Sequence, residues 1–232
     1  MDRSSELTML MASLIEEKLL HYSYSSKQDA LFSLAISGGG SPARLFELWA
    51  TEWAEKIPWE RVAFFWVDER AVPPDDPQSN YGMAKRLLFD RLPISGNNVF
   101  RIAGERAPVD EASRYSSLVE SILPVKDGIP LFDLIILGVG EDGHTASIFP
   151  GQEHLYHPQC SYSTSVNPHN GQSRITMTGT TILNAKKSIF YLMGESKKEI
   201  VKLITSNIGN KEYPAAYFLK FLKEESIFWD ER

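Results

Sequence analysis

A histidine among glycines and acidic residues follows an apolar run in the middle of the chain. The segment GVGEDGHTASIFPG, residues 138–151, comes at the end of LFDLIILG. His144 is a candidate general base, since unperturbed imidazole titrates at about pH 6.5, and Asp142 could fix its tautomer. A histidine that caps a turn is the alternative. The glycines, the strand end and the adjacent acids favour the base, and His144 is expected to open a short helical turn.

A second candidate is the glycine-rich loop SGGGSPARLF, residues 37–46. Glycines let the backbone approach a ligand, and the N-terminus of the following helix offers unpaired N–H groups to an anion. A phosphate suits this place, and a tight strand-to-helix turn is the alternative. Ser41 as N-cap and Pro42 as first helical residue form a typical start signal.

The same loop satisfies a loose dinucleotide-binding pattern. Gly38, Gly40 and Ala43 fit G-x-G-x-x-A, and Asp68 ends the next expected strand, where a ribose-binding acid would lie. Pro42 inside the motif argues against this interpretation. The sequence contains no G-x-x-x-x-G-K-[ST], so a P-loop is excluded.

Other chemically capable residues have simpler alternatives. Arg70, in VDER, could face a phosphate or a developing oxyanion, or pair with a carboxylate at a solvated strand end. His154, His157 and Cys160 are three residues apart, but their segment contains proline and has no clear helical pattern, so no metal site is predicted. Without a G-x-S-x-G motif, Ser147 is expected to be a structural hydroxyl.

Composition narrows the class of protein. The chain has 232 residues, 43% of them hydrophobic, and a net charge of −6, which suits one domain over residues 1–232 without a basic nucleic-acid-binding face. The sequence contains no run of 18 apolar residues, so no membrane span is predicted. Acids among the apolar positions of the first 20 residues favour an amphipathic helix over a signal peptide. Cys160 is the single cysteine, which excludes an intrachain disulfide and fits a cytoplasmic location.

Strand and helix patterns alternate along the chain, which predicts an α/β fold with a doubly wound, mainly parallel sheet and helices on both faces. Ligands bind at the carboxyl ends of such strands, where the polar clusters fall. Expected strands cover 31–37, 61–70, 97–104, 131–138 and 188–194, and an alternating segment covers 173–179. Expected helices cover 41–56, 81–92, 108–123 and 195–207; residues 151–173 form mostly loop with one short strand, and a helix and a strand end the chain.

Five motifs, in order, resemble 6-phosphogluconolactonases: SGGGSP, VDER…SNYG, GVGEDGHTASIFPG, RITMTGTTILNA and MGESKKEIV. The resemblance runs from about residue 30 to residue 230. Related sugar-phosphate isomerases and deaminases, such as glucosamine-6-phosphate deaminase, resemble GHIAFNEP after the shared DGH. This chain has GHTASIFPG there, which favours the lactonase.

The resemblance implies hydrolysis of 6-phospho-D-glucono-1,5-lactone in the oxidative pentose phosphate pathway, with no cofactor. His144 would activate water, and Arg70 or backbone N–H groups of the glycine turns would stabilise the oxyanion. Ser147 would not be a nucleophile. Implied phosphate ligands are Ser37, Gly38, Gly39, Gly40, Ser41, Arg70, Arg174 and Lys197, with Lys198 as the alternative to Lys197.

Some questions stay open. Gly40 and Ser41 stand where the family more often has Ser-Thr, although the loop still offers backbone N–H groups. An isomerase or deaminase acting on glucosamine 6-phosphate is the main alternative, and a non-catalytic sugar-phosphate sensor is another. The expected partner is a small sugar-phosphate lactone, not nucleic acid or membrane. A monomer is compatible with the sequence, which does not fix the oligomeric state.

Overall fold

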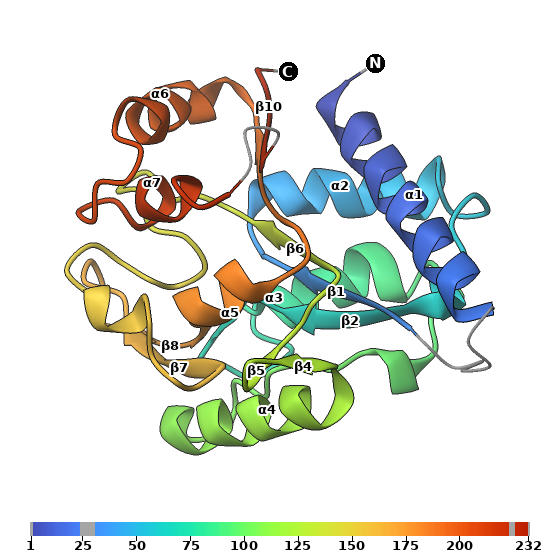
Figure 1. Cartoon of the computed structure of the whole chain (residues 1–232), viewed down its shortest axis with the longest axis horizontal. Helices are drawn as coiled ribbons and strands as arrows, with labels where there is room; N and C mark the ends of the chain where they lie inside the picture. The colour runs from blue at the N-terminus through green and yellow to red at the C-terminus, as the bar shows by residue number, and fades with distance from the viewer. Residues whose placement is uncertain (1, 24–30, 223–225, 232) are drawn as a thin grey trace.

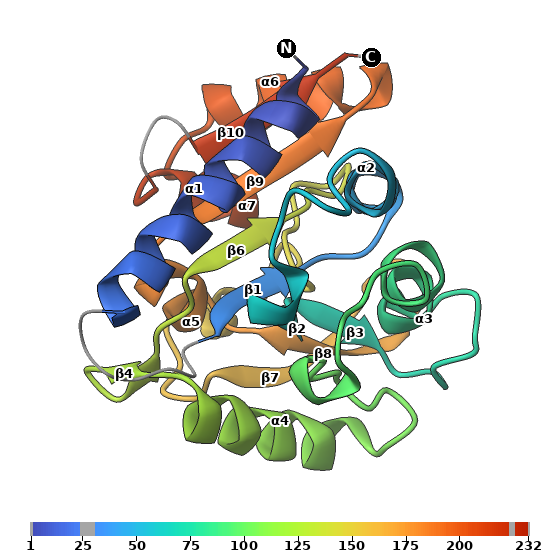
Figure 2. The same ribbon diagram turned by 90° about the vertical axis from the view of Figure 1, so that its right-hand side faces the viewer.

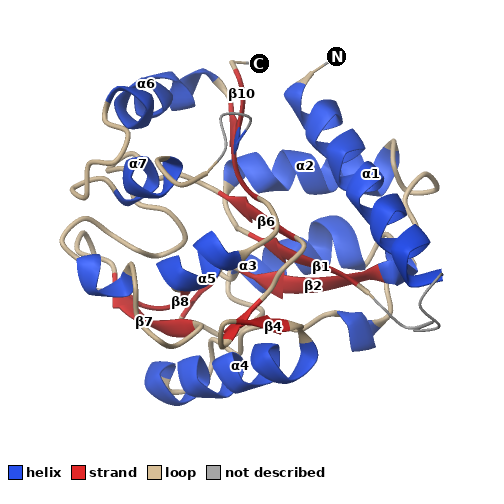
Figure 3. Ribbon diagram, viewed as in Figure 1, coloured by secondary structure: helices blue, strands red, loops and turns tan. Residues whose placement is uncertain are grey.

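The computed structural model describes residues 2–23, 31–222 and 226–231. Its centre is a five-stranded sheet in the order β10-β9-β6-β1-β2, in which every neighbouring pair is parallel (Figures 1 and 3). The strands are β1 (Phe32–Ile36), β2 (Val62–Trp66), β6 (Leu134–Leu137), β9 (Ser188–Met193) and β10 (Ile227–Asp230). The doubly wound, mainly parallel sheet is therefore confirmed.

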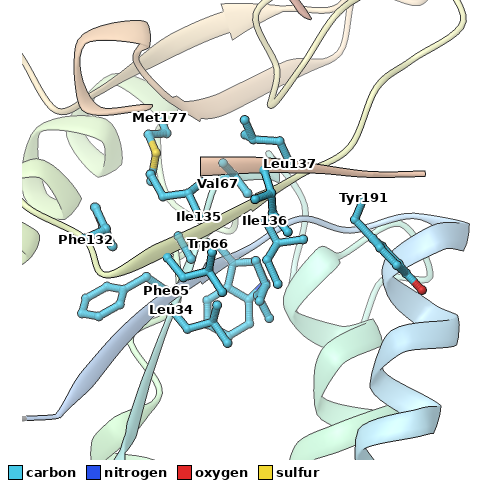
Figure 4. Packing of buried hydrophobic residues seen from close by; sticks show 14 of the residues in the cluster. Leu34, Phe65, Trp66, Val67, Phe132, Ile135, Ile136, Leu137, Met177 and Tyr191 are labelled. Atoms are coloured by element: carbon cyan, nitrogen blue, oxygen red, sulfur yellow. The ribbon is translucent and has the colours of Figure 1, made fainter. Parts of the chain in front are cut away.

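Four of these strands, β1, β2, β6 and β9, are buried along their whole length. Parallel strands covered on both faces read as continuous apolar runs, which is why the sequence indicated them clearly. Figure 4 shows Leu34, Phe65 and Ile135, from three neighbouring strands, within one cluster of buried side chains. This packing fixes the strand ends on which the polar clusters lie.

Helices cover both faces of the sheet. Figure 2 shows α1 in front of β9 and β6, with α5 and α7 behind. The predicted N-terminal helix is confirmed. The helices are α1 (Arg3–Ser23), α2 (Gly40–Thr51), α3 (Asn80–Ala84), α4 (Pro108–Ile122), α5 (Gly179–Asn184), α6 (Lys198–Ser206) and α7 (Pro214–Leu219), with a π-helical turn at Lys85–Phe89 and 3-10 turns at Trp59–Arg61, Gly96–Asn98, Glu153–Leu155 and Glu195–Lys197.

The expected single strand 61–70 is wrong, because Val67 divides it between two sheets. Its N–H donates to the Ile36 carbonyl (3.0 Å), while its own carbonyl accepts from the Met177 N–H (2.7 Å). The chain then enters an antiparallel sheet in the order β3-β8-β7, on which α4 packs. These strands are β3 (Asp68–Arg70), β8 (Ser173–Met177) and β7 (Tyr162–Val166). The second sheet places residues 68 and 70 beside the ends of β1 and β6.

Several other predictions differ in detail. The expected strand 97–104 is reduced to one bridge, Phe64↔Val99, because the chain turns away after the 3-10 turn that precedes it. The helix expected over 81–92 begins at Asn80 and continues as the π-helical turn. A short hairpin joins β4 (Val125–Lys126) to β5 (Ile129–Pro130). Residues 223–225 of the expected C-terminal elements lie outside the described residues. No helix in the described chain is long and apolar enough to cross a membrane.

Candidate active site

A cavity of about 340 Å³ lies at the carboxyl ends of β1 and β6 and beside β3 and β8. Every site residue expected from the sequence lines it except Asp142, which lies behind His144. The residues that the sequence singled out therefore come together in one cavity. The lining residues are Ser37, Gly38, Gly39, Gly40, Ser41, Pro42, Asp68, Arg70, Asn80, Gly138, Val139, Gly140, His144, Ala146, Ser147, Phe149, Asn167, Arg174 and Lys197.

His144 and Asp142 form a hydrogen-bonded pair. Nδ1 of His144 lies 2.5 Å from Oδ1 of Asp142, which also accepts the His144 N–H at 3.1 Å. Burial raises the pKa of the Asp142 carboxyl, but the hydrogen bonds and charge of His144, with a hydrogen bond from His169, outweigh it and hold the pKa well below 3.8. An ionised carboxylate only accepts, so Nδ1 carries a proton, and in the neutral form of the ring the lone pair lies on Nε2.

Glycine is required beneath and beside this pair. A Cβ on Gly140 would lie 2.0 Å from the His144 ring, so any side chain there would displace the imidazole. Gly143 has φ +83° and packs against Tyr213. The helical turn expected at His144 is wrong: Thr145 and Ile148 form an antiparallel bridge instead, with Ala146 between them at φ 51°. This tight reversal lets His144 and Ala146 both line the cavity.

The glycine loop joins β1 to α2 along the cavity. Gly39 has φ +98°, and a Cβ on Gly38 would lie 1.8 Å from Oδ1 of Asn80, so both positions need glycine. The expected N-cap at Ser41 is wrong: Gly39 is the N-cap, and the helix begins at Gly40. Ser41 Oγ instead accepts the N–H of Met193 at 2.9 Å, which ties the start of α2 to the end of β9.

Two arginines face each other across the antiparallel ladder of β3 and β8. Arg70 and Arg174 are direct register partners, and like charges so placed destabilise a sheet. Arg174 is 8% exposed. Its Nε and Nη1, and Nε of Arg70, are buried without a hydrogen-bond partner in the described residues. Burial, then the charge of Arg70, lowers the pKa of Arg174. Such cations suit an anionic ligand.

The two neighbouring lysines point to different places. Lys197 lines the cavity and donates from Nζ to the Val139 carbonyl at 2.9 Å. Lys198 forms an exposed ion pair with Glu231 at 2.9 Å. The 3-10 turn before α6 therefore brings Lys197, and not Lys198, to the cavity that holds the arginines.

The buried acid Asp68 also lines the cavity, and the sequence indicated a role for it only in the dinucleotide-binding alternative. Asp68 accepts from Ser147 Oγ at 2.5 Å, which fits the structural role expected of Ser147, and from Asn80 Nδ2 at 3.3 Å. Glu69 accepts the N–H groups of Asn80 and Tyr81, both at 2.8 Å, and so anchors the start of α3. Asn80 was missed, although it stands in the quoted SNYG motif. Its contact with Gly38 depends on strand order, which the sequence does not reveal.

The C-terminal helix braces the turn that carries His144. The N–H of Ala215 donates to the Gly143 carbonyl at 3.0 Å, and the Tyr213 ring packs against the same glycine. His157, which the sequence analysis considered as a metal ligand, instead contacts this helix: its Nε2 lies 2.6 Å from the Tyr217 hydroxyl. Among the described residues no three His, Cys, Asp or Glu side chains are grouped to hold a metal ion.

The cavity thus combines two chemical parts. Arg70, Arg174 and Lys197 supply positive charge beside the glycine loop. His144, oriented by Asp142, supplies a proton acceptor in the segment that follows the neighbouring strand β6. This arrangement suits a small substrate that carries an anionic group at one end and a centre open to base-assisted attack at the other.

Comparisons with known proteins agree with this chemistry. The curated 6-phosphogluconolactonase of Treponema pallidum is 40% identical over 181 residues, covering 78% of this chain and 75% of the relative. That of Haemophilus influenzae is 42% identical over 185 residues, covering 79% of this chain and 78% of the relative. The solved 6-phosphogluconolactonase of Trypanosoma brucei is 29% identical with a TM-score of 0.79, and the match covers 99% of this chain and 92% of that one.

The fold extends to a second enzyme class. A solved monomeric glucosamine-6-phosphate deaminase shares it, with a TM-score of 0.69 at 23% identity over 94% of this chain and 92% of that one. The family model for glucosamine-6-phosphate isomerases/6-phosphogluconolactonase matches residues 3–229. The resemblance drawn from the motifs is confirmed: the chain belongs to the glucosamine-6-phosphate isomerases/6-phosphogluconolactonase family.

Proposed function

We propose that this protein hydrolyses 6-phospho-D-glucono-1,5-lactone to 6-phospho-D-gluconate, the lactone step of the oxidative pentose phosphate pathway. One observation carries the proposal: an oriented histidine–carboxylate pair and two arginines without a carboxylate partner in the described chain share one cavity of about 340 Å³. The curated relatives carry the name of this activity.

The phosphate would bind between the arginines and the glycine loop. Arg174 and Arg70 have buried N–H groups to donate, and Lys197 adds a third positive charge. The first turn of α2 adds backbone N–H groups and the positive end of its dipole. Binding there would relieve the repulsion between the two guanidinium groups. It would also hold the lactone so that C1 alone meets the attacking water.

His144 would act as the general base. Its Nε2 takes a proton from water, and the resulting hydroxide attacks C1 of the lactone. Asp142 stabilises the imidazolium that forms, because its own low pKa keeps it ionised. The tetrahedral intermediate collapses by breaking the bond between C1 and the ring oxygen. The imidazolium returns its proton to that oxygen, which becomes a hydroxyl of the product.

The oxyanion needs a donor, and the structure favours Arg70. Two glycine amides of the catalytic turn, residues 138–144, already donate within the turn. The N–H of Gly140 donates to the His144 carbonyl (2.9 Å), and the N–H of Gly143 donates to the Gly140 carbonyl (3.0 Å). Arg70 lines the cavity and is held by the Gln78 carbonyl. Its fork could contact a phosphate oxygen as well as the oxyanion.

The test compares the wild type with His144→Ala. Glucose-6-phosphate dehydrogenase would generate the lactone in situ, and 6-phosphogluconate formation would be followed against the spontaneous rate. We expect kcat to fall by about 10²–10⁴-fold in the variant, the usual contribution of general acid–base catalysis, with an unchanged circular dichroism spectrum. Wild-type hydrolysis no faster than the spontaneous reaction would overturn the proposal. Ammonia release from glucosamine 6-phosphate would then support the deaminase alternative.

A further inference from the structure

The carboxylate of Asp142 is shared between two histidines from distant parts of the chain. Oδ1 lies 2.5 Å from Nδ1 of His144, and Oδ2 lies 3.0 Å from Nε2 of His169. His169 stands on the loop 167–172 between β7 and β8, which the proposed mechanism does not use. The contact therefore links the antiparallel sheet to the catalytic turn at the end of β6.

The loop that carries His169 is closed by its own hydrogen bonds. The carbonyl of Asn167 accepts the Gly171 N–H (2.8 Å), and its N–H donates to the Gln172 carbonyl (3.0 Å). The side chain of Asn167 accepts the N–H of His169 at 2.9 Å, and the same residue lines the cavity. Gly171 adopts φ +70°, which glycine permits without strain. His169 is thus held at a fixed place on the rim.

The same loop is tied to the far side of the cavity. Nε2 of Gln172 lies 3.1 Å from Oε1 of Gln78, and the carbonyl of Gln78 holds the Arg70 guanidinium. One short loop therefore contacts the support of the catalytic histidine at one end and the support of a phosphate-binding arginine at the other. This double attachment limits how far the tip that carries His169 can move.

We propose that His169 is a positioning residue that locks the Asp142 carboxylate in the rotation that His144 requires. The proposal rests on the lactonase function proposed above. The torsion that turns a carboxylate is broad and imposes little preference. A donor on Oδ2 restricts this torsion and keeps Oδ1 on His144 Nδ1. The imidazole then stays in the tautomer whose Nε2 can accept a proton from water.

The exposure of the His169 side chain determines how large a change in kcat we expect from its loss. The His169 side chain is 67% exposed, whereas Asp142 is 21% exposed. Exposed pairs contribute modestly, which corresponds to a change of about two- to fivefold in rate. Because His169 does not line the cavity, its loss should lower kcat and leave KM unchanged within about twofold.

The test uses two substitutions at His169 and one control. His169→Leu removes the hydrogen bond, whereas His169→Gln retains an N–H donor for Asp142. His154→Leu makes the same apolar change at another exposed histidine, in the turn 153–155 and outside the cavity lining. We expect a two- to fivefold lower kcat for His169→Leu, near wild-type kcat for His169→Gln, and no change for the control.

A second measurement does not depend on activity. The tautomer of His144 can be measured from the ¹⁵N chemical shifts of its ring nitrogens in histidine-labelled protein. We expect the Nδ1–H form to dominate in the wild type and in His169→Gln, and a mixture of tautomers in His169→Leu.

The outcomes separate the two proposals. Unchanged kcat and unchanged His144 shifts in His169→Leu would overturn the positioning role, as would a glutamine variant no better than the leucine variant. If the wild type fails to hydrolyse the lactone while the His144 shifts still respond to His169→Leu, the proposed function fails and the positioning role stands.

Discussion

Two clusters of buried charge lie at opposite ends of β1 and β6, and they are built in opposite ways. At the amino ends, Asp133 is 5% exposed and surrounded by donors. Its Oδ2 accepts from Lys18 Nζ at 2.5 Å and from the N–H and hydroxyl of Ser33 at 2.8 and 2.9 Å. Lys186 Nζ reaches its other oxygen at 2.8 Å. Lys18 and Lys186 thus both lie beside the carboxylate of Asp133.

At the carboxyl ends of the same strands, by contrast, two charges of the same sign lie side by side. Arg70 and Arg174 are register partners of like charge, with buried N–H groups that no described residue accepts. The amino-end cluster attaches α1 and the start of β6 to the sheet and contributes to folding. In the carboxyl-end cluster, Asp68 and Glu69 raise the pKa of Arg174 without outweighing its burial and the charge of Arg70, so we expect a bound anion to complete the balance of charge. The two ends of β1 and β6 thus lie beside charges of two kinds, those that stabilise the fold and those that we expect to bind the substrate.

The largest effect should come from breaking the amino-end cluster. Asp133→Ala would leave Lys18, 9% exposed at its side chain, without its carboxylate. Removing one partner of a buried pair costs about 3–5 kcal/mol, and we expect a loss of that size in the free energy of unfolding in urea. The control is Lys186→Ala, whose side chain is 54% exposed and should cost no more than about 1 kcal/mol. Equal losses would show that burial does not distinguish the two contacts.

Arg174→Met should move stability and activity in opposite directions. Removing the buried charge relieves repulsion worth up to about 1 kcal/mol, which predicts a Tm higher by roughly 2–4 °C. Losing a charged donor to the phosphate should lower kcat/KM by about 10²-fold. Lys198→Met, at the exposed pair with Glu231, should change neither by much. A lower Tm in Arg174→Met would mean that the arginine stabilises the fold.

Inorganic phosphate should stabilise the wild type through the same arginines. At ten times its Kd, a ligand specific for the folded state adds about 1.4 kcal/mol, or roughly 3–5 °C in Tm. Differential scanning calorimetry should show this shift for the wild type and for Asp133→Ala, and a much smaller one for Arg174→Met. An equal shift in all three proteins would place the anion elsewhere.

The smallest effect should be a pH dependence of stability that comes from Asp133 in the amino-end cluster. Burial raises the pKa of Asp133, but Lys18, Lys186 and Ser33 outweigh it, and the net pKa lies below 3.8. The folded state therefore binds a proton less readily than the unfolded state. The resulting stabilisation is complete above pH 3.8 and is lost as the pH falls through the folded-state pKa. Unfolding free energies of wild type and Asp133→Asn should converge below pH 4, whereas a constant difference would exclude this linkage.

The sequence predicted the parallel sheet because its buried strands are continuous apolar runs, and it predicted the cavity because polar clusters follow those runs. It did not predict the second sheet. The residues around Val67 read as one strand, and nothing local shows that its N–H and its carbonyl bond to different sheets. The position of Arg174 beside Arg70 depends on that division, so only the resemblance to relatives indicated a role for it.

Two further features depended on contacts between distant residues. Asp142 and His144 are two residues apart, and their pairing could be suggested from the sequence, whereas His169 lies 27 residues further along the chain. The choice between Lys197 and Lys198 depended on the orientation of one 3-10 turn, which adjacent residues of the same type do not reveal. The pairing of Asp142 with His144 was predictable here, whereas the turn after His144, the start of α2 and the contact of His169 were not.

The contact between α7 and the catalytic turn has a consequence for synthesis of the protein. Tyr213 and Ala215, which support Gly143, leave the ribosome about 70 residues after it, since chains are made from the N-terminus. Lys197, on the cavity rim, also follows His144 by more than 50 residues. We expect a nascent chain to complete its cavity only in the last stage of translation. Premature termination between residues 174 and 213 would then yield chains that contain His144 and both arginines but cannot support the catalytic turn.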